Sequence, residues 1–168
     1  MKLPFLRKPE REEPLVVSMT GVRLGNRLLY VGGNADLFEP LAVRVGLSGQ
    51  TTVVASDPDA LKTAAERDGV LVDTVTTIPS QGDFDLAVVE TRGAWPDAVS
   101  SLLGPVRVGG RLIVIAGARR GWRGHLRASA EPAPPDSEIV HVLEAAGWTP
   151  ARGIGSRDGV RFIEGFRH

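Results

Sequence analysis

The sequence contains no cysteine, and this absence excludes several kinds of site. Without thiols the chain has no disulfide, no thiolate metal site, no iron–sulfur cluster and no cysteine nucleophile. It also lacks an excess of charge of either sign, because 20 basic and 20 acidic side chains give a formal net charge of zero. No protein-wide field therefore attracts nucleic acid or an anionic membrane, and such a partner would need a local patch.

Aromatic residues are scarce, at 5%, and the charged start of the chain has no long apolar run. Residues 1–14 resemble neither a signal peptide nor a membrane span, so we predict a cytoplasmic protein with no membrane span. What is present is typical of a globular chain: 168 residues, of which 42% are hydrophobic and 24% charged. We expect a single domain over residues 15–168, preceded by a charged tail over residues 1–14.

Short apolar runs alternate with helical patterns through most of the chain. Turn residues bound these runs, as expected of buried parallel strands, at residues 27–31, 51–55, 84–89 and 111–116, with a weaker run at 70–75. Helices are predicted over residues 37–45, 59–68 and 96–103. This alternation predicts an α/β fold with a doubly wound, mostly parallel sheet.

The end of the chain follows a different pattern. An amphipathic helix is predicted over residues 138–146, and strand-like runs follow at 148–156 and 160–166. The pair Asp158-Gly159 between these runs is typical of a hairpin turn. We therefore expect an antiparallel hairpin to close the parallel sheet.

Candidate binding residues follow the first two strands, because open parallel sheets bind ligands beyond the carboxyl ends of their strands. Gly32, Gly33 and Asn34 follow the first strand, where glycines let the backbone approach a ligand and the next helix offers amides to an anionic group. Asp57 follows the second strand, where a carboxylate can accept both ribose hydroxyls of a nucleoside cofactor. The alternatives are an ordinary turn at the glycines and simple helix capping by Asp57, with Pro58 at the first helical position.

The order of these segments resembles the class I family of S-adenosylmethionine-dependent methyltransferases, whose fold is Rossmann-like. The resemblance covers residues 17–166 and is carried by LLYVGGN, VVASDPDAL, GDFDLAVVE and VRVGGRLIVI, in that order, with the final helix and hairpin. It implies S-adenosylmethionine as the cofactor, held by the glycine loop and by Asp57 and Pro58. It also implies that Asp73 lies near the adenine.

Under this resemblance, Glu90, Thr91 and Arg92 face the methyl acceptor after the fourth strand. We interpret Glu90 itself as a strand-end carboxylate in water rather than as a catalyst. Methyl transfer can proceed by holding a nucleophile in line with the methyl group, so no catalytic acid or base is assigned. The histidines have no partners at metal-ligand spacing, and no metal site is predicted. No motif identifies the acceptor, whether small molecule or macromolecule.

The loop departs from the family pattern at three positions. Tyr30 stands where an acidic residue is usual, and Asn34 and Asp36 stand where two further glycines are usual. Asp36 and Glu39 also place negative charge near the helix start that receives the cofactor's carboxylate. These departures favour a second hypothesis, a methyltransferase-fold protein without catalysis that serves as a binding or assembly subunit. A third, a nicotinamide-dependent oxidoreductase, would use Asp57 equally well, but the chain lacks its three-glycine fingerprint.

A loop without regular structure is expected over residues 118–136. It combines four arginines with two ring side chains: Arg119, Arg120, Arg123, Arg127, Trp122 and His125. Such residues can bind an anionic acceptor, an RNA segment or a partner protein, although a solvated, mobile loop is the simpler interpretation. The tail over residues 1–14 is likewise interpreted as a solvated extension, with docking to a partner protein as the alternative.

Overall fold

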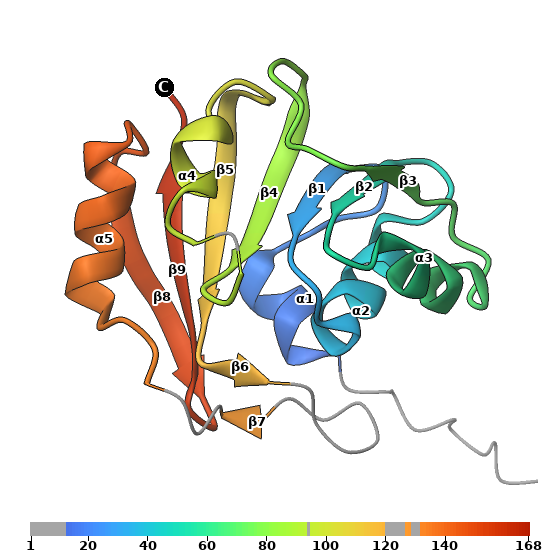
Figure 1. Ribbon diagram of the computed structural model, residues 1–168, viewed down its shortest axis with the longest axis horizontal. Coiled ribbons are helices and arrows are strands. Elements are labelled where there is room, and N and C mark those ends of the chain that lie inside the picture. Colours follow the sequence, from blue (N-terminus) through green and yellow to red (C-terminus); the bar gives the residue numbers. More distant parts are fainter. Residues whose placement is uncertain (1–12, 94, 120–126, 129–131) are drawn as a thin grey trace, which may run out of the picture.

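A seven-stranded sheet forms the centre of the molecule (Figure 1). The computed structural model describes residues 13–93, 95–119, 127–128 and 132–168. Five parallel strands run in the order β3-β2-β1-β4-β5. Beyond β5 the sheet is completed by β9, which is antiparallel to β5, and then by β8, which is antiparallel to β9. The strands are β1 (Arg27–Val31), β2 (Gln50–Val54), β3 (Asp73–Val75), β4 (Phe84–Glu90), β5 (Val106–Ala116), β8 (Ala151–Arg157) and β9 (Val160–Phe166).

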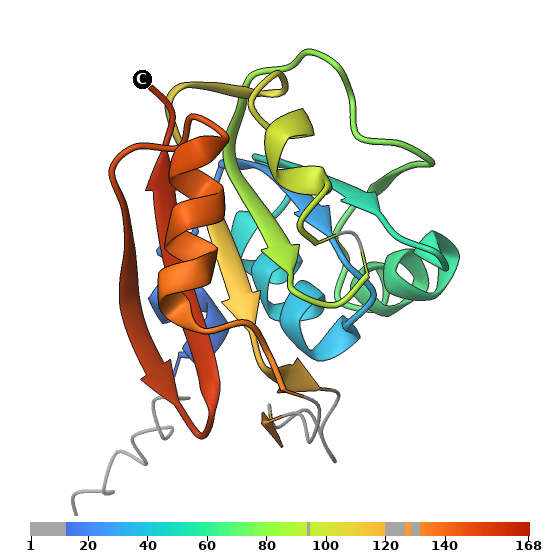
Figure 2. The ribbon, with the colours of Figure 1, turned by 60° about the vertical axis from the view of Figure 1, so that its left-hand side comes forward.

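Helices cover both faces of the sheet (Figures 1 and 2). One face carries α1 (Leu15–Thr20), α2 (Ala35–Val45) and α3 (Pro58–Glu66), and the other carries α4 (Ala98–Ser101) and α5 (Asp136–Ala145). The predicted doubly wound, mostly parallel sheet that ends in an antiparallel hairpin is therefore confirmed. No helix built from the described residues is long and apolar enough to cross a lipid bilayer.

Side chains of the central strands alternate between two hydrophobic cores. In β1, Leu28 and Tyr30 belong to the core beneath α1, α2 and α3, whereas Leu29 and Val31 belong to the core beneath α4 and α5. The neighbouring β4 alternates in the same way, so Val88 faces the α2 side of the sheet. Because successive side chains of a strand point to opposite faces, the side chain of Glu90, two residues after Val88, also points to the α2 side of the sheet.

The structure corrects several predicted boundaries. The helix predicted over residues 96–103 is only the four-residue α4, and β5 begins at Val106, earlier than the predicted residue 111. Residues 15–20, left without a predicted structure, form α1, which ends where Gly21 takes a left-handed conformation with φ 60°. α3 ends at Glu66, earlier than the predicted residue 68, and Gly69 has a φ of 77° in the turn that follows, a conformation that favours glycine.

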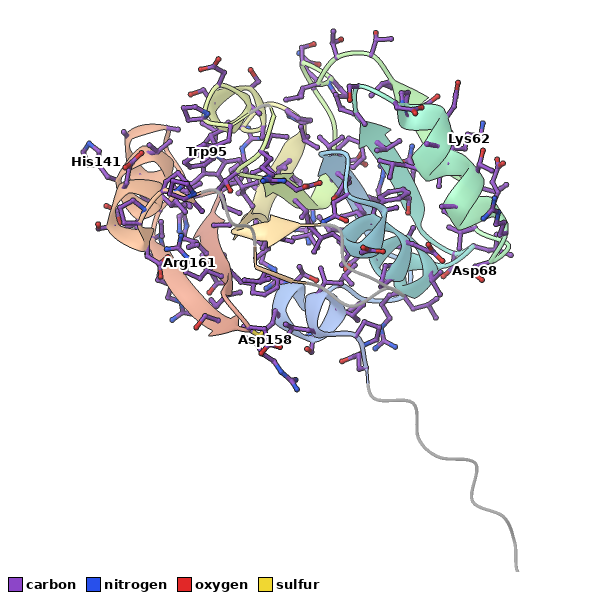
Figure 3. The ribbon with its side chains drawn as sticks, turned by 60° about the horizontal axis from the view of Figure 1, so that its bottom comes forward. Lys62, Asp68, Trp95, His141, Asp158 and Arg161 are labelled. Atoms are coloured by element: carbon purple, nitrogen blue, oxygen red, sulfur yellow. The ribbon has the colours of Figure 1, made fainter. Side chains whose placement is uncertain are left out.

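The closing hairpin has the predicted turn. Asp158 and Gly159 have φ values of 52° and 79°, and positive φ at both central residues suits the two-residue turns that match strand twist. Asp158 lies at the tip of the β8–β9 hairpin (Figure 3). Arg161 of β9 pairs with Asp136 and donates to the Pro134 carbonyl at 2.6 Å, which ties the start of α5 to the hairpin.

The described ends of the arginine-rich loop form a short antiparallel ladder. Here β6 (Ala118–Arg119) pairs with β7 (Arg127–Ala128), so the loop predicted as irregular has a paired base. Arg120, Trp122, Arg123 and His125 lie outside the described residues, and for Arg119 and Arg127 only the backbone is described.

A buried ion cluster joins the antiparallel end of the sheet to α1. Glu164 of β9 is only 4% exposed and lies 2.9 Å from Arg152 and 3.6 Å from Arg111. The Arg111 guanidinium also donates to the Thr20 carbonyl at 2.6 Å, at the end of α1. Because a buried carboxylate is costly without partners, both arginines are needed to hold Glu164 in place.

Candidate functional site

The carboxyl ends of β1 and β4 lie side by side where the strand order reverses. β1 is hydrogen-bonded to β2 on one side and to β4 on the other, and Val31 pairs with Val89. Chain segments leaving β1 and β4 therefore diverge from one edge, which is where open α/β sheets bind ligands. The glycine loop follows β1 at this edge, and Glu90 ends β4 beside it.

Glu90 points into the glycine loop and not into water. Its side chain is buried, with 6% of the residue exposed. The Oε1 atom accepts hydrogen bonds from the Tyr30 hydroxyl and, at 3.0 Å, from the Asn34 amide. The nearby Gly33 amide also acts to lower the pKa of this carboxylate. The prediction of a strand-end carboxylate in water on the acceptor side was wrong, because strand parity turns Glu90 to the same face as Val88 and Tyr30.

Gly32 is needed for the close approach of this carboxylate. A Cβ atom at Gly32 would lie 2.0 Å from Glu90 Oε1 and 2.7 Å from Glu90 Cδ. At Gly33, by contrast, a Cβ atom would meet nothing within 4 Å. The sequence predicted that both glycines let a ligand approach the backbone, but at Gly32 the approaching group belongs to the chain itself.

The Tyr30 hydroxyl donates a hydrogen bond to the buried Glu90 carboxylate. The Tyr30 hydroxyl lies 3.1 Å from the Asn34 carbonyl as well as against Glu90, and its ring packs on Phe38 with centroids 5.1 Å apart. Burial, together with the Glu90 charge, raises the pKa of Tyr30 well above its usual value, so the hydroxyl remains a donor. In the sequence, Tyr30 was noted only because an acidic residue is usual at its position. The signal for the Tyr30–Glu90 pair was the acidic residue at the end of the adjacent strand β4.

Most amides of the loop and the first turn of α2 already have acceptors. The Asn34 amide bonds to Glu90, the Gly33 amide lies near the same carboxylate, and the Gly32 amide donates to the Val54 carbonyl at 3.1 Å. Asn34 caps α2: its side chain accepts from the Asp36 amide at 3.0 Å, and its carbonyl accepts from the amides of Leu37 and Phe38. Over residues 32–38, only the Gly33 and Ala35 amides have no hydrogen-bond acceptor in the described part of the chain, and Gly33 lies near the Glu90 carboxylate. The loop therefore offers few free donors to an anion.

Gly33 and Asp57 line one hollow of about 590 Å³ between the loop and α3. Asp57 caps α3, with Oδ1 accepting from the Ala60 amide at 3.3 Å and Pro58 in the first turn. Ser56 lines the same hollow, whereas Gly32, Asn34 and Pro58 do not. The capping role predicted for Asp57 is confirmed, and its second carboxylate oxygen has no partner among the described residues.

Asp73 lies away from this edge. It is the first residue of β3, and its carboxylate accepts from the Gln50 side chain at 3.1 Å, at the opening of β2. In parallel strands these are the amino ends, whereas Asp57 follows the carboxyl end of β2. The position of Asp73 is therefore wrong for the adenine contact that the resemblance implied.

Thr91 and Arg92 line a separate hollow of about 400 Å³ beyond β4 and β5. Gly93, Gly117 and residues 132–134 complete its wall, so the hollow lies beside the end of the arginine-rich loop. Glu90 is absent from this wall because its side chain is turned toward Tyr30. Among the described residues, no group of three His, Asp or Glu side chains is placed to hold a metal ion.

Burial makes the stability of the fold depend on the protonation of Glu90. Burial raises the pKa of Glu90, although its bonds to Tyr30 and the loop amides and the charge of Arg92 oppose the increase. The folded state therefore keeps the Glu90 carboxyl group protonated to a higher pH than the unfolded state does. The stability that this protonation contributes is lost as the pH rises from about 4.5. We expect Glu90→Gln to gain stability relative to the parent as the pH rises from about 4.5 through the raised pKa of Glu90.

Urea unfolding at several pH values measures this difference. Glu144→Gln, at an exposed position of α5, is the control and should track the parent at every pH. A constant difference between Glu90→Gln and the parent across the range would contradict the assignment.

Comparison with known proteins finds solved structures that share this fold. No protein-family model and no curated protein sequence matches the chain significantly. Solved structures do match. The S-adenosylmethionine-dependent methyltransferase SibL, in its apo form, aligns with a TM-score of 0.66 at 18% identity, over 92% of this chain and 53% of that chain. A methyltransferase of the same cofactor class from Thermotoga maritima aligns with a TM-score of 0.57 at 16% identity, over 91% and 87%.

A third structure was solved with ligands. The T. thermophilus 16S rRNA methyltransferase RsmC, in complex with AdoMet and guanosine, aligns with a TM-score of 0.62 at 13% identity, over 98% of this chain and 45% of that chain. The chain thus spans about half the length of SibL and of RsmC. At these identities the likeness concerns the fold alone.

Proposed function

We propose that this chain, which has the class I methyltransferase fold, binds S-adenosylmethionine between Gly33 and Asp57 and transfers its methyl group to a small molecule or another accessible acceptor. The observation that carries the proposal is the shared hollow of Gly33, Ser56 and Asp57 at the carboxyl edge of the sheet. One oxygen of Asp57 caps α3, and the other is open to accept from ribose hydroxyls. RsmC, which has the same fold, was solved with AdoMet.

The second hollow, beside Thr91 and Arg92, is the proposed acceptor site. It lies beyond β4 and β5, on the same edge of the sheet as the proposed cofactor site. Holding the acceptor nucleophile in line with the methyl group is sufficient chemistry for this transfer, so the site needs no dedicated acid or base. Docking of a partner protein through residues 1–14 or 118–136 and a cytoplasmic location stay predictions.

A second candidate function is a binding or assembly subunit without catalysis. The filled glycine loop favours it, because the Asn34 amide already bonds to Glu90 and the Gly33 amide lies near the same carboxylate. Asp36, in the first turn of α2, adds negative charge at the same helix start. Cofactor binding distinguishes the two functions, because the methyltransferase must bind S-adenosylmethionine and the assembly subunit need not.

Calorimetric titration with S-adenosylmethionine and S-adenosylhomocysteine tests the proposal. Asp57→Ala is expected to weaken binding by at least about tenfold, because a carboxylate that accepts two hydroxyl hydrogen bonds is lost. Asp57→Asn is the matched variant, since asparagine caps a helix as well as aspartate does but has no charge. It should keep the stability of α3 while still binding the cofactor less tightly.

Two results would count against the proposal. Equal affinity in the parent and in Asp57→Ala would remove the ribose assignment. No heat of binding at millimolar ligand would favour the assembly subunit and direct the search toward protein partners.

A further inference from the structure

The Glu90 carboxylate occupies the place where an anionic ligand group would bind to the glycine loop. An anion at a helix start is held by backbone amides that have no partner within the protein. Here the Asn34 amide already donates to Glu90, and the Gly33 amide lies near the same carboxylate. An internal carboxylate thus takes a hydrogen bond that a cofactor's own carboxylate would otherwise receive.

We infer that this site holds its cofactor through the nucleoside half alone, with Glu90 as the residue that denies the loop amides to the cofactor's amino-acid carboxylate. The inference rests on the proposed function, because it concerns the same hollow between Gly33 and Asp57. The ligands of this site are then adenosine nucleosides, and their 5′ substituent contributes little to affinity.

The packing around Glu90 keeps the carboxylate in this position. The Tyr30 hydroxyl, held by ring packing on Phe38, donates to Oε1 from the strand side. Gly32 leaves no side chain in the path, and a methyl group there would overlap Oε1, Cδ and Cγ of Glu90. Two donors, the Tyr30 hydroxyl and the Asn34 amide, therefore converge on Oε1 through a gap that only glycine provides.

Electrostatic repulsion also opposes the binding of a ligand carboxylate at the glycine loop. A ligand carboxylate brought to the start of α2 meets the Glu90 carboxylate, and Asp36 in the first turn adds a further negative charge. Like charges at short range repel strongly where water is excluded. The nucleoside half meets no such opposition, because the hollow near Gly33 is open and Asp57 stands at its wall.

Two ligands that differ only in the amino-acid part test the inference. S-adenosylhomocysteine carries the carboxylate and 5′-methylthioadenosine lacks it. In calorimetric titrations of the full chain, we expect the two affinities to agree within about threefold. In Glu90→Gln the charge is gone, and we expect S-adenosylhomocysteine to gain about tenfold relative to 5′-methylthioadenosine. Glu144→Gln, which removes one charge at an exposed position of α5, should leave the ratio unchanged.

Each other outcome overturns the inference in a recognisable way. A parent that binds S-adenosylhomocysteine more than about tenfold more tightly shows that the amino-acid half is recognised, and leaves the proposed function standing. An unchanged ratio in Glu90→Gln shows that Glu90 does not set the preference. No binding of either nucleoside to the parent and to Glu90→Gln overturns the proposed function as well. The parent ratio requires no variant, so the test holds even if Glu90→Gln fails to fold.

Discussion

Replacement of Trp148 by alanine is expected to lower the free energy of unfolding by about 3–5 kcal/mol. Trp148 follows α5, is fully buried, and is the largest side chain in the core beneath α4 and α5. Its indole nitrogen donates to the Val99 carbonyl of α4 at 3.0 Å. Truncation leaves a cavity between these helices and the sheet, and also removes the donor from a buried carbonyl. Urea or thermal unfolding measures the loss.

Two further variants separate the causes of this loss. Trp148→Phe keeps most of the apolar volume but leaves the Val99 carbonyl unpaired, so a smaller loss of about 1–3 kcal/mol is expected. Leu71→Ala is the surface control, because Leu71 is 75% exposed and its truncation should change stability by about 0.5 kcal/mol or less. A loss below about 1 kcal/mol for Trp148→Ala would show that this core is not packed as described.

Gly32→Ala is expected to expel Glu90 from the glycine loop and to cost on the order of 2–4 kcal/mol. The added methyl group would lie 2.0 Å from Oε1 and within 3 Å of Cδ and Cγ, so the end of Glu90 must rotate away. That movement breaks the carboxylate's bonds to the Tyr30 hydroxyl and the Asn34 amide. It leaves the Asn34 amide without its acceptor, whereas the Tyr30 hydroxyl keeps the Asn34 carbonyl. Gly32 does not have a positive φ, so backbone strain makes no contribution.

Gly33→Ala is the matched control, one residue along the same loop. Its added methyl group would meet nothing within 4 Å, and its φ is also not positive, so we expect little change in stability. The double variant Gly32→Ala with Glu90→Ala completes the test, because removal of the side chain that clashes should make the Gly32→Ala step much less costly. Additive losses in that cycle would show that the two residues do not meet.

Local chemistry was sufficient to predict most of the fold. The apolar runs between turn residues marked the buried parallel strands, because strands covered on both faces are continuously hydrophobic. Asp57 and Pro58 marked the start of α3, and Asp158 with Gly159 marked the hairpin, because capping and positive-φ turns depend on adjacent residues alone. The short α4 was overpredicted, since a helical pattern does not show how many turns its packing supports.

The sequence by itself determined the order of strands and helices, the cap of α3 and the type of the last turn, all of which are set by neighbours along the chain. Only the tertiary structure decided what the glycine loop contains. Tyr30 and Glu90 are separated by 60 positions, and they meet because β1 and β4 are adjacent and their side chains share one face. Asp73 was misplaced for the same reason: the edge of the sheet on which a residue lies depends on where its strand begins, which no local pattern states.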